Sequence, residues 1–264
     1  MRTSDQPPAP DLVIRHLTEM PEIVESSRLI ATIWGDASGM PTNLSRAIQH
    51  AGGYVVGAYR AGRMVGTTVA FRGHVDGADV LHSHITGVTE EGQGIGTALK
   101  HHQRRWAAAQ GLAAVTWTFD PLVARNGWFN LAKLGATAHR YLVDHYGVMD
   151  DPVNAGDATD RLAVWWPVEA QPRAAVPGGE VRLLAVDELD RPALMGIDVD
   201  GSARVYAVGV PDDIAGLRSV TPNRAKEWRQ AVRVTMGEAM ALGYVVRAMR
   251  RDGTYLLTRP EEVG

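Results

Sequence analysis

The sequence predicts an α+β protein with a mixed, mostly antiparallel sheet flanked by helices and a smaller α+β unit at its C-terminal end. Apolar runs of strand length are interspersed with segments of helical period. In the N-terminal half, a Gly-containing turn joins two of the strands directly, as in a β-hairpin. The helices and strands also do not alternate strictly, as they would in a doubly wound sheet. The 264 residues are 45% hydrophobic and 22% charged, which is typical of a globular chain.

The first half of the chain predicts a strand, two helices, a hairpin and a further strand. Residues 1–11, MRTSDQPPAPD, are polar and rich in proline, so we expect them to be a disordered lead-in. The four residues Arg60–Arg63 (RAGR) separate two apolar runs and predict the hairpin turn. The strands are expected at 12–17, 53–59, 64–71 and 80–88, and the helices at 21–34 and 43–50.

The next helix is expected to begin near Thr97 and to end before Gly111, a residue type that commonly closes helices. One stripe of this helix is apolar and is expected to face the core. Its members are Ile95, Leu99, His102, Trp106 and Ala109, whereas Lys100, His101, Arg104 and Arg105 are expected on the solvated side.

A strand at 112–119, a helix at 124–134 and a strand at 161–167 are expected to complete a first domain, 12–168. Residues 169–179, EAQPRAAVPGG, have the composition of a linker. The remaining residues, 180–264, predict a smaller α+β subdomain. Its strands are expected at 181–184, 203–210, 244–249 and 254–258, and its helix at 222–242.

Charge and composition exclude several classes of function. A formal net charge of −3 argues against a nucleic-acid partner, because such proteins bind phosphates with a basic surface. The chain has no cysteine, so it has no disulfide or thiolate metal site, and the spacing of its histidines predicts no metal site either. No apolar run approaches the length that crosses a bilayer. We therefore expect a soluble, cytoplasmic protein with no membrane partner.

Glycines at 92, 94 and 96 lie between the strand ending at Val88 and the following helix. Such a loop can turn tightly and can present backbone N–H groups and the positive end of a helix to a phosphate. Two phosphate ligands are compatible with it. A dinucleotide loop followed by Asp120 as a ribose ligand would indicate a nucleotide-dependent oxidoreductase, although the spacing of the glycines departs from G-x-G-x-x-G.

The stretch VTEEGQGIGTAL resembles the acyl-CoA-binding motif of the GNAT acyltransferase superfamily. This interpretation fits the sequence of the loop better than the dinucleotide loop does. Gly94 and Gly96 match the two motif glycines, whereas Glu91 stands where the family usually has Arg or Gln. The stretches WTFDPL…RN…LGA (117–136) and NAGDATDR (154–161), with the C-terminal extension, resemble one subgroup of that superfamily.

The resemblance implies acetyl-CoA or another acyl-CoA as co-substrate. In this family the pyrophosphate rests on backbone amides of the loop, and the pantetheine lies like an added strand beside the motif strand. A backbone N–H at Gly87 or Val88 is then expected to polarise the thioester. The residues expected to bind the coenzyme are Gly87, Val88, Gly92, Gln93, Gly94, Ile95, Gly96 and Thr97 in and around the loop, with Asn126 and Asn130 at the pantetheine.

The chemistry implied is direct attack of an amine on the thioester, which needs a base and an acid. His82 and His84 are two residues apart on one strand and so share a face; His84 is expected to be the base and His82 to contact substrate. Asp120 can orient a histidine or bind the amine, or can simply form an Asp-Pro turn. The family's usual acid is a Tyr, but the matching position here is Leu131. Substitutes for that acid are Tyr141, the first choice, and Tyr146; alternatively, solvent protonates the thiolate, because CoA is a good leaving group. Arg125 and Arg161 are expected to bind the substrate.

The predicted function is therefore N-acylation of a primary amine on a small molecule, an amino acid being one candidate. A catalytically silent CoA-binding regulatory domain and the oxidoreductase remain alternatives. The C-terminal subdomain is expected either to wall the acceptor site or to build a homodimer, and the sequence leaves this open.

Overall fold

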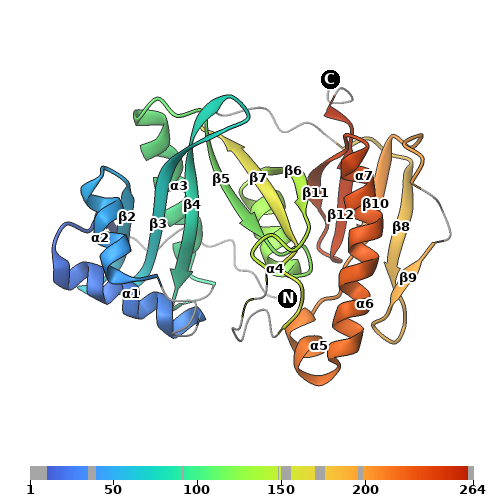
Figure 1. Ribbon diagram of the computed structural model, residues 1–264, viewed down its shortest axis with the longest axis horizontal. Coiled ribbons are helices and arrows are strands. Elements are labelled where there is room, and N and C mark those ends of the chain that lie inside the picture. The colour runs from blue at the N-terminus through green and yellow to red at the C-terminus, as the bar shows by residue number, and fades with distance from the viewer. Residues whose placement is uncertain are drawn as a thin grey trace. The chain divides into compact units, whose positions relative to one another are not determined.

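A computed structural model of the protein describes residues 11–34, 40–90, 92–147, 149, 156–169, 176–195 and 199–260. The chain forms two compact units (Figure 1). Unit 1 extends to Trp117 and includes the short segment that starts at Pro167, and unit 2 contains the rest of the chain from Thr118. The lead-in expected at 1–11 falls almost wholly outside the described residues. The domain limits expected from the sequence, 12–168 and 180–264, remain a prediction.

The sheet of unit 1 contains the hairpin that the sequence predicted, between β2 and β3. β1 (Val13–His16), β2 (Tyr54–Arg60), β3 (Arg63–Val75) and β4 (Ala78–Val88) pair antiparallel in that order. β5 (Ala114–Phe119) begins in this unit and joins β4 in parallel. The turn between β2 and β3 places Ala61 and Gly62 at φ values of 48° and 75°, which suit the right-handed twist of a two-residue hairpin. The mixed, mostly antiparallel class is confirmed.

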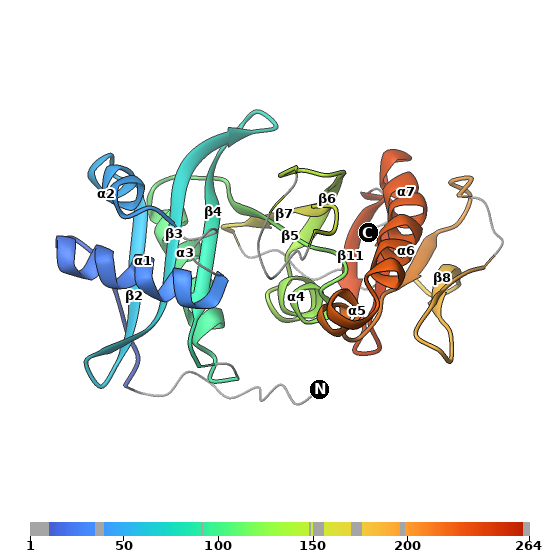
Figure 2. The same ribbon diagram turned by 60° about the horizontal axis from the view of Figure 1, so that its bottom comes forward.

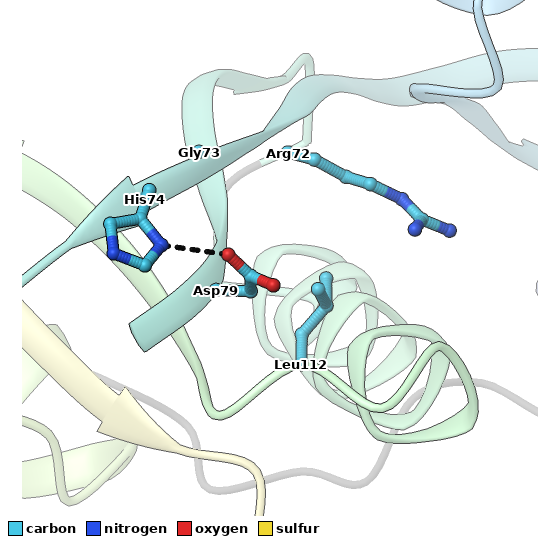
Figure 3. A pocket seen from close by; sticks show the side chains of 5 residues that line it. All are labelled: Arg72, Gly73, His74, Asp79 and Leu112. Carbon is cyan, nitrogen blue, oxygen red and sulfur yellow. Dashed lines mark hydrogen bonds and ion pairs between the residues drawn. The ribbon is translucent and has the colours of Figure 1, made fainter. Parts of the chain in front are cut away.

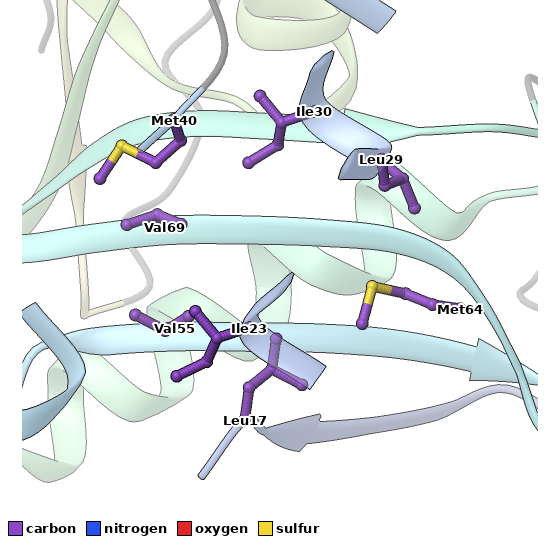
Figure 4. Close-up of a cluster of buried hydrophobic side chains, with 8 residues drawn as sticks. All are labelled: Leu17, Ile23, Leu29, Ile30, Met40, Val55, Met64 and Val69. Atoms are coloured by element: carbon purple, nitrogen blue, oxygen red, sulfur yellow. The ribbon is translucent and has the colours of Figure 1, made fainter. Parts of the chain in front are cut away.

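Helices cover both faces of this sheet (Figure 2). α1 (Met20–Trp34) and α2 (Thr42–His50) lie on one face, and α3 (Ile95–Ala109) lies on the other. Figure 4 shows the cluster that packs under α1 and α2. It consists of Leu17, Ile23, Leu29, Ile30, Met40, Val55, Met64 and Val69, each at most 8% exposed.

The buried face of α3 differs from the predicted stripe. Lys100 and Gln103 are buried together with Ile95 and Leu99, whereas Ala109 is exposed. The expectation that Lys100 faces solvent was wrong. The sheet presents small or polar groups to this part of the helix, so a polar side chain can pack there.

The strands of unit 2 lie in the order β7-β6-β11-β12-β10-β8-β9. They pair antiparallel except for β10 and β8, which run parallel. Their bounds are β6 (Thr137–Leu142), β7 (Arg161–Pro167, ending in unit 1), β8 (Glu180–Val186), β9 (Pro192–Leu194), β10 (Val205–Gly209), β11 (Val245–Met249) and β12 (Thr254–Thr258). The sequence did not indicate β6 or β9.

The helical segments of unit 2 follow the predicted ranges with one addition. The helix expected at 222–242 is one continuous run over Pro222–Ala241, and α5 (Ile214–Val220) precedes it unforeseen. That run comprises α6 (Pro222–Val232), a π-helical turn η3 (Arg233–Gly237) and α7 (Glu238–Ala241). The helix expected at 124–134 comprises α4 (Ala124–Gly127) and a second π-helical turn, η2 (Trp128–Lys133). Among the described helices, none has the length and apolar character needed to cross a membrane.

Candidate functional site

The loop between β4 and α3 has a backbone geometry that is compatible with phosphate binding. Gly92 and Gly94 have φ values of 76° and 74°, a left-handed conformation that glycine adopts without strain. Gly94 is the N-cap of α3, and its carbonyl accepts the first intrahelical bond from Ala98 at 3.0 Å. The N–H groups over residues 95–97 therefore have no acceptor within the helix and mark its positive end. Gly96, expected in the loop, lies in the first turn of the helix.

The charge of Glu90, which precedes this loop, is neutralised by two arginines. Glu90 lies 2.6 Å from the Arg60 guanidinium and 3.0 Å from that of Arg63. A neighbouring anion therefore meets little repulsion from Glu90. Glu91, which stands where the resemblance leads one to expect Arg or Gln, lies outside the described residues.

The edge of β4 that faces away from β3 is paired over only part of its length. The ladder with β5 joins 80–82 to 114–116, and β4 then continues to Val88. Among the described residues, no strand pairs with this edge beyond His82. The register with β3 also slips, because Val69 opposes Ile85 and the next residue of β3 opposes Ser83, which leaves His84 as the extra residue of a bulge.

Alternation along β4 identifies which backbone groups face the unpaired edge. Thr89 donates its N–H to the Val65 carbonyl on β3 at 3.0 Å. In an antiparallel ladder every second residue points to the partner strand, so the N–H of Gly87 also faces β3. The N–H groups of Val88 and Thr86 face the open edge. Of Gly87 and Val88, the two donors predicted for the thioester, only Val88 presents its N–H to the open edge.

The two histidines of β4 lie on the sheet face opposite α3. The ring of Phe71 is 5.2 Å from that of His82 and 6.3 Å from that of His84, between centroids. His82 Nδ1 also lies 3.3 Å from the Thr116 hydroxyl. His84 is exposed to solvent, yet the protein atoms around its ring lower its pKa below the usual value by desolvation. It is therefore neutral at pH 7 and can accept a proton.

The other face of the same segment holds a buried lysine, Lys100, which was expected at the surface. Lys100 Nζ donates to Ser83 Oγ at 2.9 Å, and Gln103 Nε2 donates to the same hydroxyl at 3.1 Å and to Thr68 Oγ1 at 2.7 Å. The ammonium also lies 3.9 Å from the ring centroid of Trp117. Burial lowers the pKa of Lys100 to about 7.

The remaining predicted residues belong to unit 2, where Asp120 is held in a buried ionic network. Its carboxylate lies 2.6 Å from Arg218 and 2.9 Å from Arg229, and Asp157 contacts both arginines at 2.9 Å. Burial alone would raise the pKa of Asp120, but Arg229 and Arg218 outweigh it and hold that pKa at about 2. Asp120 Oδ1 also accepts the backbone N–H of Leu122 at 2.9 Å, as expected of an Asp-Pro turn. This arrangement favours a structural role.

Tyr141 is also engaged within unit 2. Its hydroxyl donates to Asp160 at 2.7 Å, and Asp160 pairs with Arg233 at 2.6 Å. Burial, followed by the charge of Asp160, raises the pKa of Tyr141 above its usual value, so its phenol is a weak acid. Arg161 is buried, with one guanidinium nitrogen 2.9 Å from the Asp160 carbonyl and its centre 5.4 Å from the ring of Tyr146.

The other predicted contacts of unit 2 lie on α4 and η2. Arg125 is exposed, and Asn126 is half-buried with its N–H bonded to the Val123 carbonyl at 2.9 Å. Asn130 is 4% exposed, and its carbonyl accepts the N–H of Ala136 at 3.0 Å. Their roles toward a coenzyme stay predictions.

A surface pocket of about 380 Å³ lies in unit 1 at the opposite end of β4 from the loop. Figure 3 shows its lining, in which His74 Nδ1 lies 2.8 Å from an Asp79 carboxylate oxygen. Both side chains are more than half exposed, and none of the predicted site residues lines this pocket. The described residues contain no group of three or more side chains that could hold a metal ion.

No protein-family model matches the chain, and no curated protein matches it. Among solved structures, the ribosomal-protein-S18-alanine N-acetyltransferase from Escherichia coli is 15% identical, with a TM-score of 0.47 over 61% of this chain and 96% of its own. An acetyltransferase of the GNAT family from Streptococcus pneumoniae is 14% identical, with a TM-score of 0.47 over 59% of this chain and 99% of its own. Naa50 from Arabidopsis thaliana, in complex with a bisubstrate analogue of CoA, is 16% identical, with a TM-score of 0.46 over 59% of this chain and 97% of its own. At these values the likeness concerns the course of the chain and carries no argument about activity.

Proposed function

We propose that the protein is an acyl-CoA-dependent N-acyltransferase that moves an acetyl or other short acyl group to a primary amine of a small molecule. The observation that carries this proposal is the junction of β4 and α3. There, a left-handed glycine loop opens a 15-residue helix beside a strand edge that stays unpaired after His82. A helix N-terminus suits a pyrophosphate, and an unpaired edge suits an extended chain with amide groups.

In this proposal the pyrophosphate binds the N–H groups over residues 95–97, and the pantetheine extends along the open edge from Val88 toward Ser83. The N–H group of Val88 is then a donor for a pantetheine amide, and that of Thr86, nearer Ser83, is the donor for the thioester carbonyl. A donor aimed at the carbonyl oxygen stabilises the negative charge that develops there. His84, neutral at pH 7, takes the proton of the attacking amine.

The alternative of a catalytically silent CoA-binding domain has one observation in its favour. Leu131 is fully buried where the resemblance places the family's acid, and the hydroxyl of Tyr141 is bonded to Asp160. The oxidoreductase alternative assigns Asp120 to a ribose. Because both carboxylate oxygens of Asp120 are bonded to arginines, we do not propose that alternative.

Two measurements test the proposal. Thermal shift is recorded with acetyl-CoA, succinyl-CoA, NAD and NADP, since a ligand at a hundredfold excess over its Kd stabilises the folded state by about 2.7 kcal/mol. Release of CoA from acetyl-CoA is then followed with a panel of free amino acids and aliphatic amines. We expect stabilisation by acyl-CoA alone, and turnover with at least one amine. Stabilisation by acyl-CoA without turnover would support the silent binding domain, and stabilisation by NAD or NADP alone would support an oxidoreductase.

The matched variants are Gly94→Ala and Gly111→Ala. Both glycines are left-handed, at φ 74° and 71°, and they flank the two ends of α3. Alanine costs about 1–2 kcal/mol in that conformation, so the two variants should lose similar stability. Only Gly94→Ala should shift the N–H groups that bind the pyrophosphate, and we expect it to weaken acetyl-CoA binding at least tenfold.

A further inference from the structure

Lys100 lies at the point where β4 and β5 cease to pair. The last paired residues are His82 and Thr116, and the next residue on each strand contacts this lysine. Its Nζ donates to Ser83 Oγ at 2.9 Å and lies 3.9 Å from the ring centroid of Trp117. The lysine therefore lies on the α3 side of the point where the open edge of β4 begins.

The amine of Lys100 is costly to bury in this environment. The residue is 5% exposed, and in the described part of the chain no carboxylate pairs with it. A buried charge without a counter-ion is strongly unfavourable, and the contact with Trp117 and the bond to Ser83 recover only part of the loss. A methionine or leucine would fill this space at lower cost if the role were packing alone. Packing alone therefore does not account for the amine at this position, whereas a chemical role would.

We propose that Lys100 is the acid that protonates the thiolate leaving the thioester, an inference that rests on the proposed function. Pantetheine extended along β4 from Val88 toward Ser83 would bring the sulfur to the point where Lys100 lies. The acceptor nitrogen attacks the carbonyl carbon and forms the C–N bond, and the C–S bond breaks with its electron pair going to sulfur. The sulfur takes a proton from Nζ, His84 takes the proton of the attacking nitrogen, and solvent restores both residues.

The chemistry of the amine suits this step. Thiols have a pKa of about 8.5, and burial holds the pKa of Lys100 at about 7, so transfer from the ammonium to the thiolate is downhill. Burial also favours the neutral amine that remains. Ser83 accepts bonds from both Lys100 and Gln103, which fixes the position of the ammonium.

The test compares Lys100→Met with Lys226→Met, a matched change at an exposed lysine. Each is assayed for CoA release from acetyl-CoA with the best acceptor of the amine panel, from pH 5.5 to 9. General acids contribute about 10²–10⁴-fold, so Lys100→Met should lower kcat at least about a hundredfold with KM and the acetyl-CoA thermal shift unchanged. The acid must be protonated to act, so the wild-type kcat should fall as the pH rises through about 7. The variant should lack this fall, and Lys226→Met should keep it.

A second variant separates proton transfer from charge. Lys100→Arg keeps a cation over Trp117, but a guanidinium does not release its proton in this pH range, so turnover should also be lost. Wild-type turnover in Lys100→Arg, or a kcat of Lys100→Met within threefold of wild type, would overturn the inference while leaving the proposed function intact. If the wild-type protein showed neither stabilisation by acetyl-CoA nor CoA release, the proposed function would fail and this inference with it.

Discussion

Removing one member of the buried network of Asp120, Asp157, Arg218 and Arg229 should strongly destabilise unit 2. Each of the two carboxylates lies 2.6–2.9 Å from both guanidinium groups, and the four side chains are 4–9% exposed. Replacing Asp120 with Asn keeps the shape but leaves two buried arginines with one carboxylate. Breaking a buried pair in this way costs about 3–5 kcal/mol, because the remaining charge is not compensated.

The same network makes stability depend on acid pH. The pKa of Asp120 is held at about 2, below its ordinary 3.8, which corresponds to about 2 kcal/mol of stability. Because the folded pKa is the lower one, this contribution is complete above about pH 5 and is lost as the pH falls toward 2. Asp120→Asn should lose that part of the acid dependence.

Urea unfolding at pH 7 and at intervals down to pH 2 measures both effects. Asp79→Asn is the control, because Asp79 pairs with His74 at the surface and exposed pairs contribute little. Adding Arg218→Met to Asp120→Asn should restore part of the stability, since Arg229 and Asp157 then balance. A loss below about 1 kcal/mol in Asp120→Asn, or no recovery in the double variant, would refute this reasoning.

Two further predictions concern the base and the packing of unit 2. His84→Gln should lower the rate of CoA release by at least about a hundredfold. It should also remove the fall in rate that the wild type shows as the pH drops below the lowered pKa of His84. His74→Gln, a change at an exposed histidine away from the loop, should alter neither the rate nor its pH dependence. Gly127→Ala should destabilise the folded protein by about 1–3 kcal/mol in thermal unfolding, because the new Cβ would lie 2.2 Å from the Tyr255 hydroxyl. Gly178→Ala should unfold at the wild-type temperature, because its new Cβ would meet nothing within 4 Å.

Local pattern was sufficient to predict the elements around the loop. Val88 ends the strand as expected, and Gly94 caps a helix that begins at Ile95, two residues before the predicted start. Gly111 follows its end in a left-handed conformation, as predicted. Each of these features is determined by neighbours in sequence, namely hydrophobic runs and glycine conformations, and so can be deduced from one chain.

Tertiary contacts account for what could not be deduced. Lys100 follows Leu99 on the helix, so a periodic pattern assigns it to solvent, and only the position of Ser83 on the sheet makes its burial possible. The partners of Asp120 lie 98 and 109 residues further along the chain, beyond any local signal. Strand β6, TAHRYL, alternates too weakly to stand out and is ordered by pairing with β7 and β11.

The most direct test of the central claim is calorimetric titration of acetyl-CoA into wild-type protein, Gly94→Ala and Gly111→Ala. If α3 and its glycine loop hold the pyrophosphate, the wild type and Gly111→Ala should bind with similar affinity, and Gly94→Ala should bind at least tenfold more weakly. Equal binding by all three proteins would contradict the assignment of the loop. No binding by the wild type would contradict the proposed function itself.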